Sequence, residues 1–382
     1  MPLISIVIPA HGRSLYTRDA VFSVLHQDFD DFDLTLSNNG GSPDVKRGVA
    51  EFMADPRFHY IEQPNLLNMP LHWEIASRAV AGDYLIILTN RCVLKQGVLS
   101  KIATCLRSAN NIELVSWRWD DYIKSNGVLI PYSSPSSAPS SIRTCDELLT
   151  FARAPDLVYH SYIMPRGMNS CVSHSLIERI RRREGSAFQK IVPDLRFAFS
   201  CLLNANEIIH YDQAFFISQG LEVSNGAAVF RGDFRPYLDS VCCSEPWEDV
   251  PIKAPLVFNA IAQDFLEALR KYGRNDIRAE WNRSKYYTDC LMEIRIKRDA
   301  GILTASQIAE LTKAVDLALQ SEAESVRASV AAPIARRVLN KIKSLGRNVV
   351  RSAADRFRPH RHQTGDKMTF PTALDAAGFK HR

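Results

Sequence analysis

The sequence contains no apolar run long enough to cross a membrane. Its aliphatic stretches, such as residues 85–88, fall far short of the roughly 20 residues that a bilayer requires. The first residues lack the basic segment, apolar core and cleavage site of a signal peptide, and they lead directly into a strand-like segment. We therefore expect a cytoplasmic protein.

Paired cysteines are absent as well. The eight cysteines form no Cys-x-x-Cys motif and no Cys/His spacing that suits zinc. In a reducing compartment, isolated cysteines behave as small apolar residues. We therefore expect them to be buried in the core and not to bind a metal.

A net positive charge is absent except at the C-terminal end. The formal net charge is +5, but residues 333–382 contain twelve Lys and Arg against three Asp, so the rest of the chain is slightly acidic. Between residues 334 and 361 basic and apolar residues alternate as in an amphipathic helix, which could hold the protein peripherally on the anionic inner face of the plasma membrane. A solvated helix or a flexible end is an equally good interpretation. No nucleic-acid partner is expected, because the basic segment lacks interleaved aromatic residues.

The first third of the chain alternates between short apolar and amphipathic segments. We expect strands at 3–8, 32–36, 58–62 and 84–88, and helices at 17–25, 44–53, 70–80 and 96–108. Such alternation predicts an α/β fold with a parallel sheet covered by helices. Ligands bind such sheets beyond the carboxyl ends of the strands, so the loops that follow strands are the candidate site.

The pattern changes along the chain. A strand is expected at 112–117, a helix from Pro193 and a strand at 208–218, and from about residue 236 the sequence becomes mainly helical. We therefore predict a catalytic domain at 1–235, a helical C-terminal extension at 236–330 and a basic amphipathic or flexible tail at 331–382.

Four segments follow one another in an order known from one enzyme family. They are ISIVIPAHGR at the first strand, SNNGGSPD after the second, NMPLHWEIASRAVAGDYLIIL before the loop at 89–92, and IVPDLRFAFSCL further on. Over roughly residues 3–230 the chain thus resembles the family-2 glycosyltransferases, which are inverting enzymes. The resemblance implies a GT-A (Rossmann-like) fold, whose mixed, mainly parallel sheet is flanked by helices. It also implies a nucleotide-sugar donor and a glycan or lipid-linked acceptor.

Matching positions imply which residues bind the donor. They are Pro9, Ala10, His11, Arg13, Asn38, Asn39, Trp73, Asn90 and Arg91. Asn38 and Asn39 could offer a base both a donor and an acceptor, although Asn-Asn-Gly-Gly is also a strong turn signal. Arg13 could bind a phosphate or be an ordinary surface arginine. Trp73, which precedes Glu74 on a helix that the family turns toward the donor, could equally belong to the core.

Asp194 is the candidate catalytic base. An inverting transfer needs one carboxylate that takes the proton from the attacking acceptor hydroxyl. The resemblance places Asp194 in that role, because it matches the Asp of the family's Pro-Asp segment. The alternative is that Asp194, next to Pro193, caps a helix, and the two roles are compatible.

The family's Asp-x-Asp metal motif is missing. Where the resemblance implies it, the chain has Thr89-Asn90-Arg91-Cys92. Because Mg²⁺ and Mn²⁺ prefer charged oxygen ligands, we expect no metal ligands here and disfavour a divalent-metal cofactor. Arg91, assisted by Lys95, could supply the positive charge instead. Unconventional metal use and a decayed site are the alternatives.

These features predict an inverting, metal-independent glycosyltransferase. Its place in bacterial surface polysaccharide synthesis rests on family analogy alone. The rival hypothesis is a non-catalytic nucleotide-sugar-binding or scaffold protein that uses the same cleft. A nucleotidyltransferase would need a pair of metal-binding carboxylates at the phosphate site, where the sequence has none.

Overall fold

The fold is described from a computed structural model, for residues 1–108, 111–132, 138–156, 160, 162–189, 191–219, 234–241, 246–330 and 368–379. The strands in these residues are β1 (Ile4–Ala10), β2 (Phe32–Asn39), β3 (Phe58–Gln63), β4 (Tyr84–Ile87), β5 (Cys92–Leu94), β6 (Leu114–Ile123), β7 (Val128–Ile130), β8 (Ser140–Arg143), β9 (Ser170–Ser173), β10 (Glu207–Gln219) and β11 (Met368–Thr369). The helices are α1 (Ser14–Leu25), α2 (Pro43–Gly48), the 3-10 helix η1 (Ala50–Phe52), α3 (Met69–Arg78), α4 (Val98–Ser108), α5 (Thr144–Arg153), α7 (His174–Glu184), α8 (Pro193–Asn204), α10 (Arg235–Val241), α11 (Val257–Lys271), α12 (Asn275–Ala279), α13 (Arg283–Asp299), α14 (Ala305–Gln320) and α17 (Ala373–Ala376).

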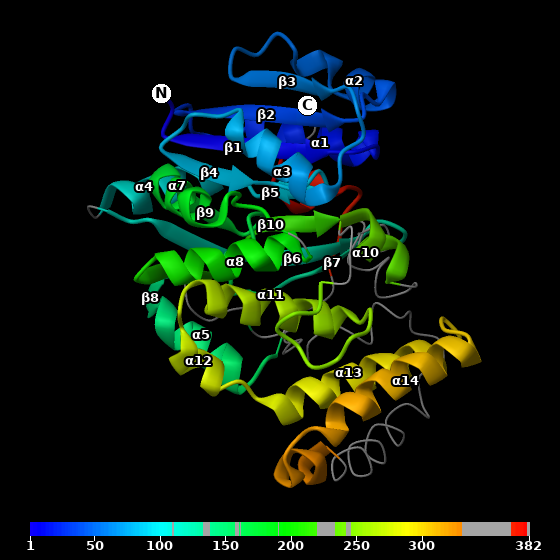
Figure 1. Ribbon diagram of the computed structural model, residues 1–382. Coiled ribbons are helices and arrows are strands. Elements are labelled where there is room, and N and C mark those ends of the chain that lie inside the picture. The colour runs from blue at the N-terminus through cyan, green and yellow to red at the C-terminus, as the bar shows by residue number, and fades with distance from the viewer. Residues whose placement is uncertain are drawn as a thin grey trace.

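All the strands belong to one mixed sheet (Figure 1). Its main path runs β11-β7-β6-β9-β4-β1-β2-β3, and β10 pairs with β6, β5 and β8 beside this path. The strands β4, β1, β2 and β3 are parallel, whereas β9 runs antiparallel between β4 and β6. The predicted α/β class, a mixed sheet flanked by helices, is confirmed.

Each face of the sheet covers its own apolar core. Strand β1 is buried along its whole length, since Ile6 and Ile8 contact one core and Val7 contacts the other. The first core lies under α1, α2 and α4. The second lies under α3, α7 and α8 and continues through α11, α13 and α14, which follow one another away from the sheet in Figure 1.

The carboxyl ends of β1, β2 and β4 meet at one edge of the sheet. Ala10 pairs with Asn38, and Val7 pairs with Ile87, so these strands end close together. The ends of these strands and the loops that leave them contain the predicted donor-binding residues, except Trp73, which lies on α3. The strand β5 begins directly after the loop at 88–91 and pairs antiparallel with β10, which the sequence did not indicate.

The C-terminal half is described in two separate parts. The helices of residues 246–330 pack in the same hydrophobic core as α8, so this core includes residues from both sides of residue 235. The domain boundaries at 235 and 330 stay predictions. Of the predicted tail, residues 331–367 and 380–382 lie outside the described residues. Residues 368–379 form β11 and α17 and pack on the sheet. Within the described ranges, no helix is both long and apolar enough to cross a membrane.

A buried carboxylate on α11 supports the beginning of α8. Asp264 accepts the main-chain amide of Val192 at 2.7 Å and that of Ile191 at 2.9 Å. The side chain is fully buried, and this burial raises the pKa of Asp264 from 3.8 to about 7, although the positive charge of Arg196 and the amide bonds oppose the rise.

We predict that Asp264→Asn changes how stability depends on pH. Folding raises the pKa of Asp264, so between pH 3.8 and about 7 the folded protein binds one more proton than the unfolded chain. The wild type should therefore lose up to about 4 kcal/mol of stability as the pH rises through this range. Urea unfolding across this range should show a smaller decline for Asp264→Asn than for the wild type.

The exposed Asp239, replaced by Asn, serves as the control and should leave the pH dependence of the wild type unchanged. Parallel stability curves for Asp264→Asn and the wild type would contradict the role of Asp264.

Candidate active site

The turn after β1 carries the first cation of the site. Pro9 and Ala10 are buried in β1, and the exposed His11 leads to Gly12 and Arg13, whose φ angles of 63° and 55° lie in the left-handed region. For Arg13, which has a Cβ, this conformation is strained. Arg13 is the residue that precedes α1, and its carbonyl accepts the amide of Thr17 at 3.0 Å. The turn therefore holds the Arg13 backbone at the carboxyl edge of β1.

Asn90 fixes this turn from the neighbouring loop. Its amide nitrogen Nδ2 donates to Thr17 Oγ1 at 3.1 Å and to the Gly12 carbonyl at 3.4 Å. Only 5% of Asn90 is exposed. The structure thus places Asn90 between the loops after β1 and β4, where its amide group supports the Arg13 turn.

Arg91 brings a second cation to the same edge. Its Nη1 donates to the Gln219 carbonyl at 2.8 Å, while the Gln219 amide donates to the Arg91 carbonyl at 3.0 Å. Burial, together with the positive charge of Arg91, lowers the pKa of Arg13 below its ordinary value. Two guanidinium groups that influence each other in this way favour an anionic ligand between or beside them.

The two asparagines of β2 have different surroundings. Asn39 bonds to the main chain of Leu67 with both ends of its amide, at 2.8 and 2.9 Å. The main-chain carbonyl oxygen of Asn39 lies 3.1 Å from His11 Nδ1. Asn38 donates to Tyr60 Oη at 2.8 Å, and its buried Oδ1 has no hydrogen-bond partner among the described residues. Of the two amides, that of Asn38 retains an acceptor atom that a ligand could use.

Trp73 lies in the hydrophobic core. It is 5% exposed and packs edge-to-face on Phe188, with ring centroids 5.6 Å apart. Glu74, next to it, accepts Arg181 Nε at 2.9 Å and the amide of Ala187 at 2.8 Å. The structure therefore places both side chains against the segment that precedes α8, and not with Arg13 and Arg91.

Asp194 occupies the second position of α8 and pairs with a residue that the sequence did not single out. Arg166 donates to Asp194 Oδ2 through Nε at 2.9 Å and also through Nη2. The next residue, Gly167, has a φ of 87°, and a Cβ there would lie 3.3 Å from the Cβ of Ile87. This close approach holds the Arg166–Asp194 pair beside the carboxyl end of β4.

A buried amide organises the loop that carries Arg166. Asn169 Oδ1 accepts the Arg166 amide at 2.9 Å, and its Nδ2 donates to the carbonyls of Met164 and Trp117 at 3.0 and 3.2 Å. The segment Arg-Gly-Met-Asn matches no catalytic motif. A glycine directly after an arginine was the only sequence signal for this turn.

The side chains that could serve as metal ligands in the loop at 89–92 do not suit a hard divalent cation. The amide of Asn90 is engaged with Thr17, Arg91 is a cation, and burial raises the pKa of the Cys92 thiol and so disfavours the thiolate. Lys95, which we expected to assist Arg91, is paired with Asp120 at 2.6 Å. No cluster of three or more His, Cys, Asp or Glu side chains suited to a metal occurs among residues that the structure describes.

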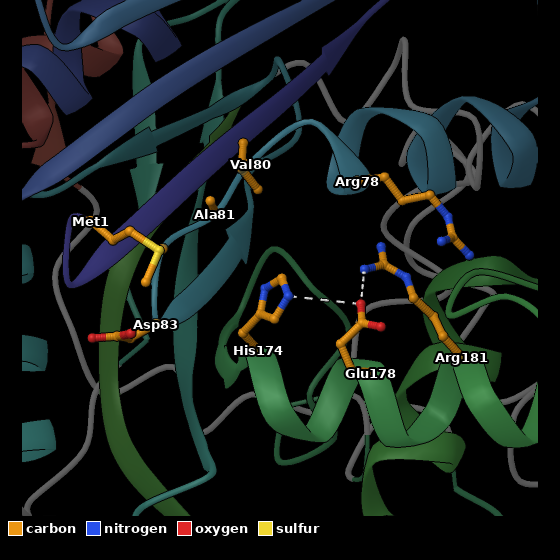
Figure 2. A pocket seen from close by; sticks show the side chains of 9 residues that line it. Met1, Arg78, Val80, Ala81, Asp83, His174, Glu178 and Arg181 are labelled. Atoms are coloured by element: carbon orange, nitrogen blue, oxygen red, sulfur yellow. Dashed lines mark hydrogen bonds and ion pairs between the residues drawn. The ribbon is translucent and has the colours of Figure 1, made fainter.

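A pocket of about 500 Å³ lies at the other end of the sheet, where β4 begins (Figure 2). In this pocket Glu178 lies between Arg181 and His174, at 2.7 and 3.8 Å. The pocket is therefore separate from the loops that carry Arg13 and Arg91.

Comparison with known proteins agrees with this arrangement. Residues 5–127 match the family model described as glycosyl transferase family 2. No curated protein matches the chain. The crystal structure of S. aureus TarS aligns with a TM-score of 0.50 and 12% identity over 86% of this chain and 50% of TarS, so the chain spans about half the length of that protein. TarS 1-349 in complex with UDP-GlcNAc aligns with a TM-score of 0.51 and 14% identity over 86% and 84% of the two chains.

These matches concern the fold and the first third of the chain. The structural likenesses show that the chain has the GT-A fold of glycosyltransferases. The family match over residues 5–127 agrees with the resemblance predicted from the sequence. In the loop where that resemblance implies the family's metal motif, this chain carries Arg91.

We predict that Asn90→Ala destabilises the protein. The substitution leaves Thr17 Oγ1 and the Gly12 carbonyl without their bond from Asn90, and both Asn90 and Thr17 are buried. We expect a loss of about 1–3 kcal/mol in the free energy of unfolding, measured with urea. Asn65, which is exposed in the loop before α3, provides the matched control when replaced by Ala. Equal stability of Asn90→Ala and Asn65→Ala would show that Asn90 has no structural role.

Proposed function

We propose that this protein transfers a sugar from a nucleotide-sugar donor to a glycan or lipid-linked acceptor, with inversion at the anomeric carbon and without a divalent metal. The observation that carries the proposal is the pair of cations, Arg13 and Arg91, at the carboxyl edge of the sheet, where the family holds the donor's diphosphate. The related GT-A structure TarS 1-349 was solved with UDP-GlcNAc, which supports a donor of this class.

Asp194 is the proposed base. The acceptor hydroxyl attacks the anomeric carbon, the bond from that carbon to the diphosphate oxygen breaks, and the hydroxyl proton passes to Asp194. Both bonds from Arg166 go to Oδ2, so Oδ1 is the oxygen that takes the proton. Arg166 thereby orients the carboxylate.

Arg91 and Arg13 take the place of the metal. The leaving nucleoside diphosphate gains negative charge as its bond to the sugar breaks, and fixed positive groups stabilise that charge. Guanidinium groups bind phosphate through two parallel hydrogen bonds, and they keep their charge at every physiological pH. The bond of Arg91 to the Gln219 carbonyl restricts its position before the donor binds.

Asn38 is the proposed contact to the base. Its buried Oδ1 can accept a hydrogen bond from a ring N–H such as that of uracil or guanine. His11, Pro9 and Ala10 supply the backbone that closes this side of the site. The acceptor, a role in bacterial surface polysaccharide synthesis and peripheral attachment to a membrane by the basic tail remain parts of the proposal that rest on the sequence.

We predict that Asp194→Asn lowers the rate of transfer by a factor of about 10² to 10⁴, the contribution of a general base. The donor affinity should change much less, because Asp194 acts on the acceptor. Transfer is measured across a panel of nucleotide sugars and acceptors, and Asp276→Asn, on the exposed helix α12, is the control.

Unchanged transfer by Asp194→Asn would exclude it as the base. Donor binding without turnover in the wild type, for every donor and acceptor, would favour the non-catalytic alternative.

We predict that EDTA leaves the activity intact, whereas Arg91→Gln reduces it about a hundredfold, as expected for loss of a group that stabilises the transition state. Arg91→Lys should retain more activity, because it keeps the charge but loses the paired hydrogen bonds. The matched control is Arg18→Gln. Arg18 lies on α1 and forms an exposed ion pair with Glu51. Loss of activity in EDTA and its recovery with Mn²⁺ would contradict the role of Arg91.

A further inference from the structure

The end of the described chain, residues 368–379, returns to the sheet and is named here the C-terminal clasp. Its strand β11 pairs antiparallel with β7, and the Phe370 amide donates to the Gly127 carbonyl at 2.9 Å. A Cβ at Gly127 would lie 2.7 Å from the Phe370 carbonyl oxygen, so the two backbones approach closely. Tyr122 Oη donates to the Phe370 carbonyl at 2.9 Å. The clasp is thus bound through its main chain.

The apolar side of the clasp covers β5. Leu374, Ala377 and Phe379 are buried in one cluster with Val93 of β5 and Ile217 of β10. Figure 1 shows this segment, in red, beside β5 and β10. A further hydrogen bond joins the clasp to the segment after β5: the main-chain amide of Gln96 donates to the Ala377 carbonyl at 3.0 Å.

The residues that the clasp buries are neighbours of those that hold Arg91. Val93 pairs with Ile217 in the antiparallel ladder, and two residues further along the Gln219 amide donates to the Arg91 carbonyl. Strand β5 has only three residues and, in the described chain, pairs with β10 alone. Cys92 and Leu94 pack in the core under α1, and the clasp covers Val93, between them. Such a short strand depends on packing from neighbouring elements to be stably ordered.

We propose that the C-terminal clasp is a positioning element for the donor site. By covering Val93 and Ile217 it fixes the β5–β10 pair and thereby holds the Arg91 guanidinium where the donor diphosphate binds. The first part of this inference concerns the order of β5. The second part, donor binding, rests on the proposed function.

The test uses the full chain with Leu374→Asp, which places a charge in the apolar cluster between clasp and β5. Hydrogen exchange of the amides in residues 92–96 should become at least about tenfold faster, because the packing that protects them is lost. The KM for the donor should rise about tenfold because Arg91 contacts the diphosphate of the bound donor, and kcat should fall as well because the same group stabilises the leaving diphosphate. Leu317→Asp, at a leucine 56% exposed on α14, is the matched control and should match the wild type in both measurements.

Rescue separates an undocked clasp from a misfolded protein. A synthetic peptide of residues 368–379, added to Leu374→Asp, should slow the exchange of 92–96 again and lower the donor KM. Phe379→Ala, which shortens the same apolar side, should give a smaller effect in the same direction.

Two results would overturn the inference: exchange at 92–96 unchanged by Leu374→Asp, or faster exchange with an unchanged donor KM. A wild type that binds no nucleotide sugar would refute the proposed function and with it the donor-site role, whereas the exchange measurement would still decide whether the clasp orders β5.

Discussion

The proximity of two guanidinium groups is the constraint on which the proposed site depends. Burial lowers the pKa of Arg13, and the positive charge of Arg91 lowers it further. Neither residue can relax freely, since Arg13 forms the strained turn before α1 and Arg91 is bonded to Gln219. Under the proposed function a diphosphate binds at this edge, because it carries the opposite charge and accepts hydrogen bonds from guanidinium groups.

Two buried acidic residues near the site, Glu74 and Asp264, stabilise the scaffold. Glu74 and Asp264 lie on different helices, α3 and α11, and both accept main-chain amides of the segment that leads into α8. A buried carboxylate is costly unless such donors surround it, and each residue joins its helix to the segment that carries Asp194. The helical region after residue 246 thus contributes to the position of the proposed base, although it lies far from Asp194 in the sequence.

The sequence predicted the parts of this arrangement that depend on local pattern. The alternation of β-branched and amphipathic segments predicted the strands at β1 to β4 and the helices between them, because periodicity reports burial. It could not predict the partners of Asn90 and Asp194. The Asn90 amide bonds to Thr17, and Asp194 pairs with Arg166, and both contacts join segments that only the folded chain brings together. The clasp escaped prediction for the same reason, since its twelve residues carry no pattern that names β7 as their partner.

In the proposed site the residues of the loop at 89–92 act together, which favours replacement of the metal over decay. In a site that had merely lost its acids, the substituted side chains would have no reason to share a function. Here Asn90 supports the turn that carries Arg13, Arg91 provides the second cation, and Cys92 begins the strand that the clasp stabilises. A carboxylate at position 90 could not donate to the Gly12 carbonyl as the Asn90 amide does. In the proposed site, the absence of metal ligands and the presence of the second cation thus belong to one loop.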